Sequence, residues 1–382
     1  MIALDTMSVL VVDDMKSMRL TIRKMLRSLN IGKKLLFAEN GKQGLSILKQ
    51  TPCDMVIIDW NMPVMNGSEM LNHLRNDKNL RDMPVIMVTA ENERDVVSEV
   101  AEIEIDAYLL KPLTLAALDQ KIRQVVENAN NPDPTTRYLL AAREYEESGD
   151  LEKAIEQIRL ALVNKPSASR ILRKMGLLHF KLGKSGIGEK CLQKAIAVNR
   201  QDTASRVSLA EYYMKKKQYL KAASLYMEIL ALSDLYFENG LDLGRKLLDN
   251  GFSQEALDIF SKIFVRSGKA LQIKESIIDI CTAYKEIEFA KQKMSDILRD
   301  NPYNSQMAFK AGILHRDTMD METALAYFKT ADSLEKGHLG AKMEIARIHW
   351  RNNRILEADE CLTQILRLDP ENKDAQGLRR KL

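Results

Sequence analysis

Residues 55–63 read Met-Val-Ile-Ile-Asp-Trp-Asn-Met-Pro, four apolar residues that end in an acid and then break at a proline. Residues 56–58 are all β-branched, which predicts a strand that is buried on both faces of a sheet. The carboxylate of Asp59 would then lie at the carboxyl edge of the sheet, where α/β folds bind ligands. Considered alone, Asp59 would more simply be an acid that caps a turn. Whether it is a functional carboxylate depends on which other residues lie beside it.

Four more short apolar runs occur in the first 128 residues, and helical patterns alternate with the runs. The predicted strands are residues 9–12, 35–38, 56–58, 84–89 and 107–110. After each strand, apolar residues recur every three or four positions, as they do on one face of a helix. These helical patterns cover residues 18–29, 45–48, 70–74, 96–103 and 115–125. Five strand–helix alternations predict an α/β fold, a doubly wound parallel (βα)5 sheet with helices on both faces.

Chemically active side chains stand at the ends of these predicted strands. Right-handed crossovers bring the carboxyl ends of parallel strands to one edge. The side chains gathered there would be Asp13, Asp14, Asp59, Thr89 and Lys111. Three carboxylates repel each other, and Mg²⁺, a hard cation with oxygen ligands, would relieve that repulsion. The lysine and the hydroxyl suit a phosphoryl group, so the edge has the parts needed to phosphorylate a carboxylate.

The segments that carry these predictions resemble the receiver domain of response regulators, and especially that of the chemotaxis regulators. The matching residues are Val-Val-Asp-Asp at 11–14, Asp-Trp-Asn-Met-Pro at 59–63, Val-Thr-Ala-Glu at 88–91, Tyr108 and Lys-Pro at 111–112. They cover about the first third of the chain. The resemblance implies that residues 1–128 form a receiver domain with the flavodoxin-like fold and that Mg²⁺ is its cofactor.

The resemblance also implies a role for each matched side chain. Asp59 would be the phosphoacceptor, and Lys111 and Thr89 would contact the phosphoryl oxygens. The Mg²⁺ ligands would be Asp13 (through water), Asp14, Asp59 and the backbone carbonyl of Asn61.

A switch and a limited phosphoryl lifetime are implied in the same way. Tyr108 would turn inward when Thr89 is drawn to the phosphoryl group, whereas Asn61 and Glu91 would lie beside the attacking water. The chief departure from the family is Met15, where chemotaxis regulators have an aromatic residue, and we expect little effect because methionine is also apolar. A receiver-like relic without phosphorylation is the alternative, but such relics usually lack an acid, the lysine or the hydroxyl, and all are present here.

The rest of the chain is repetitive. Residues 129–134 contain two prolines, which predicts a linker. From residue 135 onward, the sequence pattern repeats every 34 residues. A small residue recurs at 154, 188, 222, 256, 290, 324 and 358, and a larger apolar residue follows four positions after each. This pattern resembles the tetratricopeptide repeat. It predicts an all-α solenoid of seven repeats over residues 135–382, with residues 373–382 as a short terminal helix that covers the last repeat.

Composition restricts the partners. The net charge is +4, and neither part has a dense basic patch, so nucleic-acid binding has no support. Four widely spaced cysteines suit a reducing compartment. The sequence lacks a basic signal-like N-terminus and an apolar run of about 20 residues. We therefore expect a cytoplasmic protein with no membrane partner.

The sequence thus predicts a two-component response regulator without a separate enzymatic output domain. A sensor histidine kinase would phosphorylate Asp59, and the repeats would bind a protein or peptide partner that the sequence does not identify. The resemblance to chemotaxis regulators suggests a motility pathway by analogy. The alternative is a constitutive scaffold in which the receiver domain is a docking module or a phosphate sink.

Overall fold

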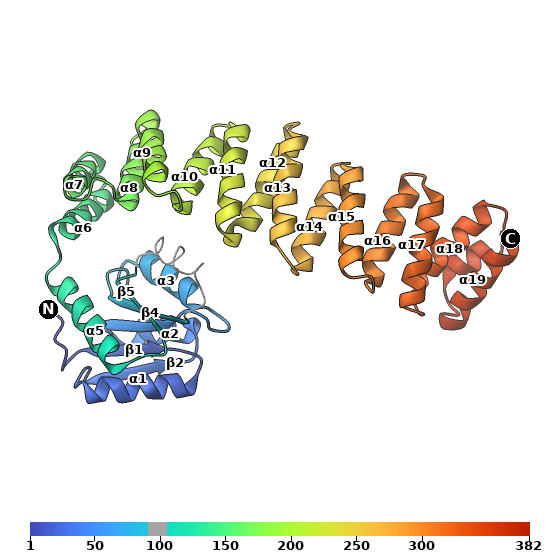
Figure 1. Cartoon of the computed structure of the whole chain (residues 1–382). Coiled ribbons are helices and arrows are strands. Elements are labelled where there is room, and N and C mark those ends of the chain that lie inside the picture. The colour runs from blue at the N-terminus through green and yellow to red at the C-terminus, as the bar shows by residue number, and fades with distance from the viewer. Residues whose placement is uncertain (91–104) are drawn as a thin grey trace. The chain divides into compact units, whose positions relative to one another are not determined.

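The computed structural model describes residues 1–90 and 105–382. These residues fall into two compact units, Met1–Tyr212 and Tyr213–Leu382. The first unit contains a β-sheet with its helices and the beginning of a series of helix pairs, and the second continues the series (Figure 1).

The sheet has five strands, all parallel, in the order β2-β1-β3-β4-β5. The strands are β1 (Ser8–Val12), β2 (Lys34–Ala38), β3 (Met55–Asp59), β4 (Val85–Ala90) and β5 (Ala107–Lys111). β3 is the central strand, and every one of its residues is buried, as the β-branched run predicted. The predicted doubly wound parallel sheet is confirmed.

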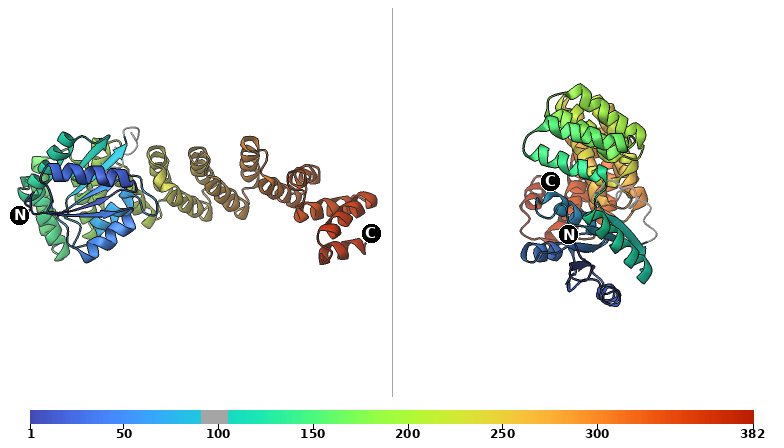
Figure 2. Two further views of the ribbon diagram at one scale, coloured as in Figure 1. Left: turned by 90° about the horizontal axis from the view of Figure 1, so that it is seen from below. Right: turned by 90° about the vertical axis from the view of Figure 1, so that its left-hand side faces the viewer.

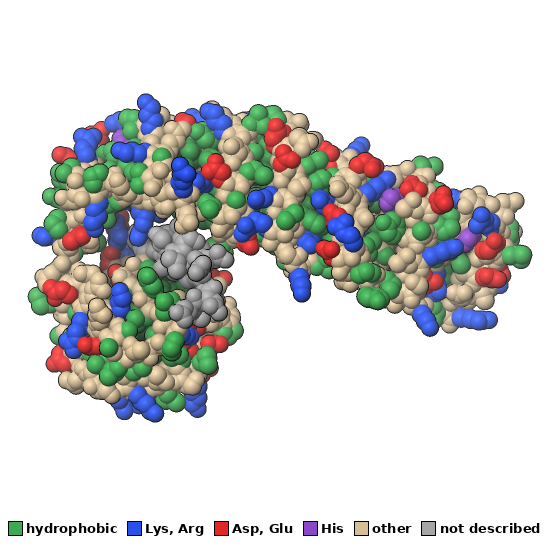
Figure 3. Space-filling view, in the orientation of Figure 1, with side chains coloured by type: hydrophobic (Ala, Val, Ile, Leu, Met, Phe, Trp, Pro, Cys, Tyr) green, Lys and Arg blue, Asp and Glu red, His purple; other side chains and the backbone are tan. Residues whose placement is uncertain are grey.

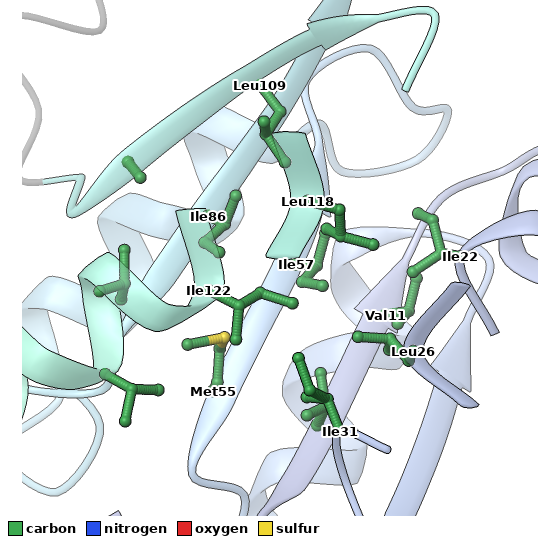
Figure 4. Packing of buried hydrophobic residues seen from close by; sticks show 14 of the residues in the cluster. Val11, Ile22, Leu26, Ile31, Met55, Ile57, Ile86, Leu109, Leu118 and Ile122 are labelled. Atoms are coloured by element: carbon green, nitrogen blue, oxygen red, sulfur yellow. The ribbon is translucent and has the colours of Figure 1, made fainter. Parts of the chain in front are cut away.

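Helices cover both faces of the sheet. They are α1 (Lys16–Ser28), α2 (Gly41–Gln50), α3 (Gly67–Asn76) and α5 (Leu115–Asn130). The helix predicted over residues 96–103 lies outside the described residues. Alternate strand residues point to opposite faces, so two cores form. One core packs Val11 and Ile57 against α1 and α5 (Figure 4), and the other packs Val12 and Ile58 against α2 and α3.

Helix pairs at the predicted spacing make up the remainder of the chain (Figures 1 and 2). In the first unit and across its boundary, they are α6 (Pro134–Glu147), α7 (Leu151–Asn164), α8 (Ser169–Lys181), α9 (Ser185–Val198) and α10 (Thr203–Lys215). In the second unit they are α11 (Tyr219–Leu232), α12 (Phe237–Asp249), α13 (Ser253–Arg266), α14 (Leu271–Ala283), α15 (Ile287–Asp300), α16 (Ser305–Asp317), α17 (Met321–Leu334), α18 (Leu339–Arg351) and α19 (Ile355–Leu368). A 3-10 turn, Asp234–Tyr236, precedes α12, and α20 (Lys373–Arg379) is the predicted terminal helix.

The repeated small residues allow the two helices of a pair to approach closely. The recurring alanines, such as Ala154 and Ala324, are fully buried, and so are large residues such as Phe328 four positions later. Phe328 packs on Gly312 of the preceding helix, where a Cβ would lie 2.6 Å from the ring. The period is therefore a packing period, in which a large side chain on one helix needs a small residue on its neighbour.

The connection between the sheet domain and the first repeat is short. α5 ends at Asn130 and α6 begins at Pro134, so residues 131–133 are the non-helical link. Within the first unit, two ion pairs join the segment before β4 to α6. Arg81 pairs with Glu147, and Asp82 pairs with Arg143.

Candidate functional site

Five polar side chains meet at the carboxyl edge of the sheet. Asp59 is the last residue of β3, Asp13 directly follows β1, and Lys111 is the last residue of β5. Thr89 lies near the end of β4, beside β3, and Asp14 follows Asp13. The parallel register places these strand ends side by side, although the residues span about a hundred positions in the sequence.

The distances define a compact cluster of charges. The Nζ atom of Lys111 lies 2.6 Å from Oδ1 of Asp59 and 3.2 Å from Oδ2 of Asp13. One carboxylate oxygen each of Asp13, Asp14 and Asp59 lies within 4.8 Å of the other two. One lysine therefore serves two of the three carboxylates.

Burial and neighbouring charges shape the ionisation of this cluster. Asp59 is only 5% exposed and Asp13 only 1%, whereas Asp14 is exposed. Burial raises the pKa of Asp59, the hydrogen bond and the charge of Lys111 oppose that shift, and Asp13 and Asp14 add to it. Burial acts to lower the pKa of Lys111, but its bonds to the two acids outweigh that effect, so the pKa is raised and the side chain stays cationic.

The donor set fits a hard divalent cation. Three carboxylates and one nearby ammonium leave a negative excess in a partly buried cluster, and such a cluster favours a cation with oxygen ligands. Among residues 1–90 and 105–382, Asp13, Asp14 and Asp59 form the one cluster of three or more Asp, Glu, His or Cys side chains that could hold a metal ion. Asn61, which was predicted to offer its carbonyl, is exposed two residues after Asp59.

Of the predicted switch and water-positioning residues, Thr89, Tyr108 and Asn61 lie within the described ranges. Thr89 is 5% exposed, and Tyr108 on β5 is 45% exposed, an outward-facing position. Met15 is exposed and donates its backbone N–H to Oδ1 of Asp13 at 2.8 Å. Glu91 lies outside the described residues, so its place beside the attacking water stays a prediction.

The loop after Asp59 adds a residue whose role the sequence did not reveal. Gly67 is the first residue of α3. A Cβ built on Gly67 would lie 2.3 Å from the backbone oxygen of Asp59, and the Gly67 N–H donates to the Trp60 oxygen at 2.8 Å. The beginning of α3 therefore packs directly against the backbone of Asp59, and only glycine permits that approach.

The same loop contains one strained residue. Val64 has a φ of 71°, a left-handed conformation that β-branched residues rarely adopt. Its side chain is 77% exposed, so packing does not repay the strain. The loop that connects Asp59 to α3 therefore imposes this backbone conformation on Val64.

Comparison with known families agrees with both parts of this architecture. Residues 9–123 match the model of the response regulator receiver domain. Residues 136–166, 173–236 and 317–382 match tetratricopeptide repeat models. No catalytic output domain is evident among these matches.

Curated relatives are similar to the first third of the chain. Chemotaxis protein CheY-3 of Vibrio cholerae is 37% identical over 121 residues, which cover 32% of this chain and 92% of that protein. Chemotaxis protein CheY of Pseudomonas aeruginosa is 38% identical over 124 residues, 32% of this chain and 99% of that protein. The solved structure of the chemotaxis response regulator CheY4 of Vibrio cholerae is 27% identical, covers 31% of this chain and 98% of its own chain, and has a TM-score of 0.30.

The sequence matches and the convergence of acids, lysine and threonine at one sheet edge lead to the same conclusion. The chain belongs to the response-regulator family, with an N-terminal receiver domain homologous to CheY proteins and a series of tetratricopeptide repeats after it.

Proposed function

We propose that a sensor histidine kinase phosphorylates Asp59 in a reaction that requires Mg²⁺, and that the repeats bind a protein or peptide partner. The observation that carries the proposal is the buried carboxylate of Asp59, which lies 2.6 Å from Lys111 and beside Asp13 and Asp14. In receiver domains, this chemistry depends on positioning and charge neutralisation more than on proton transfer.

The chain's own groups have defined tasks in this proposal. A carboxylate oxygen of Asp59, stripped of water by burial, would attack the phosphorus of the kinase's phosphohistidine. The new O–P bond replaces the P–N bond, and the imidazole leaves with the electron pair of that bond. Lys111 orients that carboxylate and afterwards pairs with a phosphoryl oxygen, and the hydroxyl of Thr89 donates to another. Asp13 (through water), Asp14, Asp59 and the Asn61 carbonyl would hold Mg²⁺, which would supply positive charge to offset that of the phosphoryl group.

Phosphorylation would then act as a switch. A phosphoryl group adds nearly two negative charges, which draw Thr89 inward and leave space for Tyr108 to follow. Asn61 and Glu91 would flank the attacking water and shorten the phosphoryl lifetime. We propose that this change alters partner binding by the repeats and that no separate enzymatic output exists.

The proposed organisation is a receiver domain over residues 1–128, a linker at 129–134 and seven repeats over 135–382. The helix α5 runs two residues into the linker. Within the described ranges, no helix is long and apolar enough to cross a membrane. In the face shown in Figure 3, basic and acidic side chains are interspersed, which favours a protein partner over nucleic acid. We propose a cytoplasmic location.

The phosphoacceptor can be tested by labelling with acetyl phosphate. Asp59→Asn keeps the size of the side chain and removes the nucleophile, so labelling in Mg²⁺ should disappear. Asp119→Asn is the matched control, because Asp119 lies on α5 in an exposed pair with Arg123, and it should label normally. Undiminished labelling of Asp59→Asn would refute the assignment.

A second assay separates a switch from a constitutive scaffold. The full chain, with and without a beryllofluoride phosphoryl mimic, would be used to capture and titrate a partner. A tenfold change in affinity, about 1.4 kcal/mol, supports the switch. Equal affinity in the two states supports the scaffold, in which the receiver domain only docks or stores phosphate.

A further inference from the structure

Arg19 is a buried cation that the proposed chemistry does not use. It lies in the first turn of α1, and its side chain is only 11% exposed. A charged group is seldom buried without partners that repay the loss of hydration. The partners of Arg19 therefore indicate what holds it there.

The guanidinium group contacts the acid pair from the backbone side. Its Nη1 atom donates to the carbonyl oxygen of Asp13 at 2.7 Å and to that of Asp14 at 3.0 Å. Its Nη2 atom lies 2.6 Å from Oε1 of Glu39, directly after β2. One planar group thus joins two successive carbonyls after β1 to an acid after the neighbouring strand.

These bonds restrain the backbone that carries the carboxylates of Asp13 and Asp14. Two peptide planes that share a single donor cannot rotate independently, so the backbone of Asp14 is held on both sides. The Asp13 N–H also donates to the Ala38 oxygen at 3.2 Å. With the carbonyls tied to Arg19, the carboxylates of Asp13 and Asp14 converge with that of Asp59 to within 4.8 Å.

We propose that Arg19 is a positioning residue for the divalent-cation site, which holds the backbone of Asp13 and Asp14 so that their carboxylates meet Asp59. The inference rests on the proposed cation-dependent function. The positive charge of Arg19 lies behind the acids and also offsets part of their mutual repulsion.

The contacts require arginine and not merely a cation. Nη1 and Nη2 point to acceptors on two neighbouring strand ends, a reach that suits the rigid, planar fork of a guanidinium. A lysine ammonium is a point charge on a flexible stem, and it would not hold both carbonyls and Glu39 in one geometry. Arg19→Lys therefore separates charge from positioning.

Binding of Mn²⁺, followed by the loss of the free-ion electron paramagnetic resonance signal, tests the proposal without phosphorylation. Mn²⁺ accepts the same oxygen ligands as Mg²⁺. Arg19→Met and Arg19→Lys in the full chain should bind at least tenfold more weakly than wild type, as expected for the loss of a group that orients ligands. Arg23→Met is the matched control on α1, because Arg23 lies over the Phe37 ring and away from the acids. It should bind normally.

Two further measurements distinguish positioning from a general folding defect. Thermal unfolding shows the temperature at which every variant is folded, and titrations are done below it. A folding defect would reduce the number of binding sites and leave the affinity of each unchanged, whereas a positioning defect lowers the affinity. For the same reason, the Mg²⁺ concentration that half-saturates acetyl phosphate labelling should rise in Arg19→Lys.

The outcomes also separate this inference from the proposed function. Wild-type affinity in a folded Arg19→Met overturns the positioning role alone. If wild type and Asp14→Asn bind Mn²⁺ equally, or wild type binds none, the cation site and the positioning role both fail. Weaker binding by both Arg19 variants, with normal binding by Arg23→Met, supports the inference.

Discussion

Replacement of Gly67 by alanine should disable the phosphoacceptor although no reactive group is changed. A Cβ at this position would lie 2.3 Å from the backbone oxygen of Asp59, 2.9 Å from the Met87 methyl carbon and 3.0 Å from the Trp60 Cα. Two of these three contacts are with backbone atoms, which cannot rotate away as a side-chain end can. The beginning of α3 or the end of β3 must therefore move.

The size of the movement follows from the contact distance. Ordinary van der Waals contact for a Cβ begins near 3.4 Å, so the Asp59 backbone and α3 must separate by about 1 Å. A misplacement of about 1 Å in a reacting group costs on the order of 100-fold in rate. Overpacking of this kind also destabilises a domain by about 1–3 kcal/mol. We expect acetyl phosphate labelling to slow by about two orders of magnitude.

Gly44→Ala provides the matched control in the same domain. Its Cβ would meet the methyl end of Met70 at 2.7 Å and Cγ2 of Val12 at 3.2 Å. Both are side-chain atoms, so the added methyl group does not press on the backbone of Asp59. Labelling rates of both variants, measured at a temperature where both are folded, give the comparison. Labelling of Gly67→Ala within threefold of wild type would show that the close approach to Asp59 does not matter.

Other predictions concern strain and pH. Val64→Asn should stabilise the receiver domain by about 1 kcal/mol, because asparagine tolerates the left-handed conformation better. Urea denaturation followed by Trp60 fluorescence in a Trp350→Phe background measures this, and an unchanged midpoint would contradict it. His179 and His349 are 6% exposed, and burial first, then neighbouring lysines, lowers the pKa of each. Below about pH 6.5 these histidines become protonated in the unfolded chain but stay neutral in the folded repeats. The free energy of unfolding of the repeats should therefore fall as the pH drops below that value. The denaturation midpoints at pH 7.5 and 5.5 should differ less in a His179→Tyr, His349→Tyr double variant, and an equal difference would refute the mechanism.

Much of the architecture was predictable because its signals are local. A β-branched run such as residues 56–58 specifies a buried strand, and a small residue every 34 positions specifies paired helices. The acids and the lysine could be assigned to one site because parallel topology brings all strand ends to one edge. The role of Glu91 and the helix over 96–103 stay predictions, since these residues lie outside the described ranges.

The sequence by itself determined which side chains lie at the carboxyl edge of the sheet, since that depends only on the order and direction of the strands. Only the tertiary structure decided which atoms are in contact. Lys111 pairs with Asp59 and Asp13, and Arg19 donates to the carbonyl oxygens of Asp13 and Asp14. It also decided that Gly67 must lack a side chain. Hydrophobic periodicity carries no information about these contacts, because each depends on ångström-scale distances between segments that are remote in sequence.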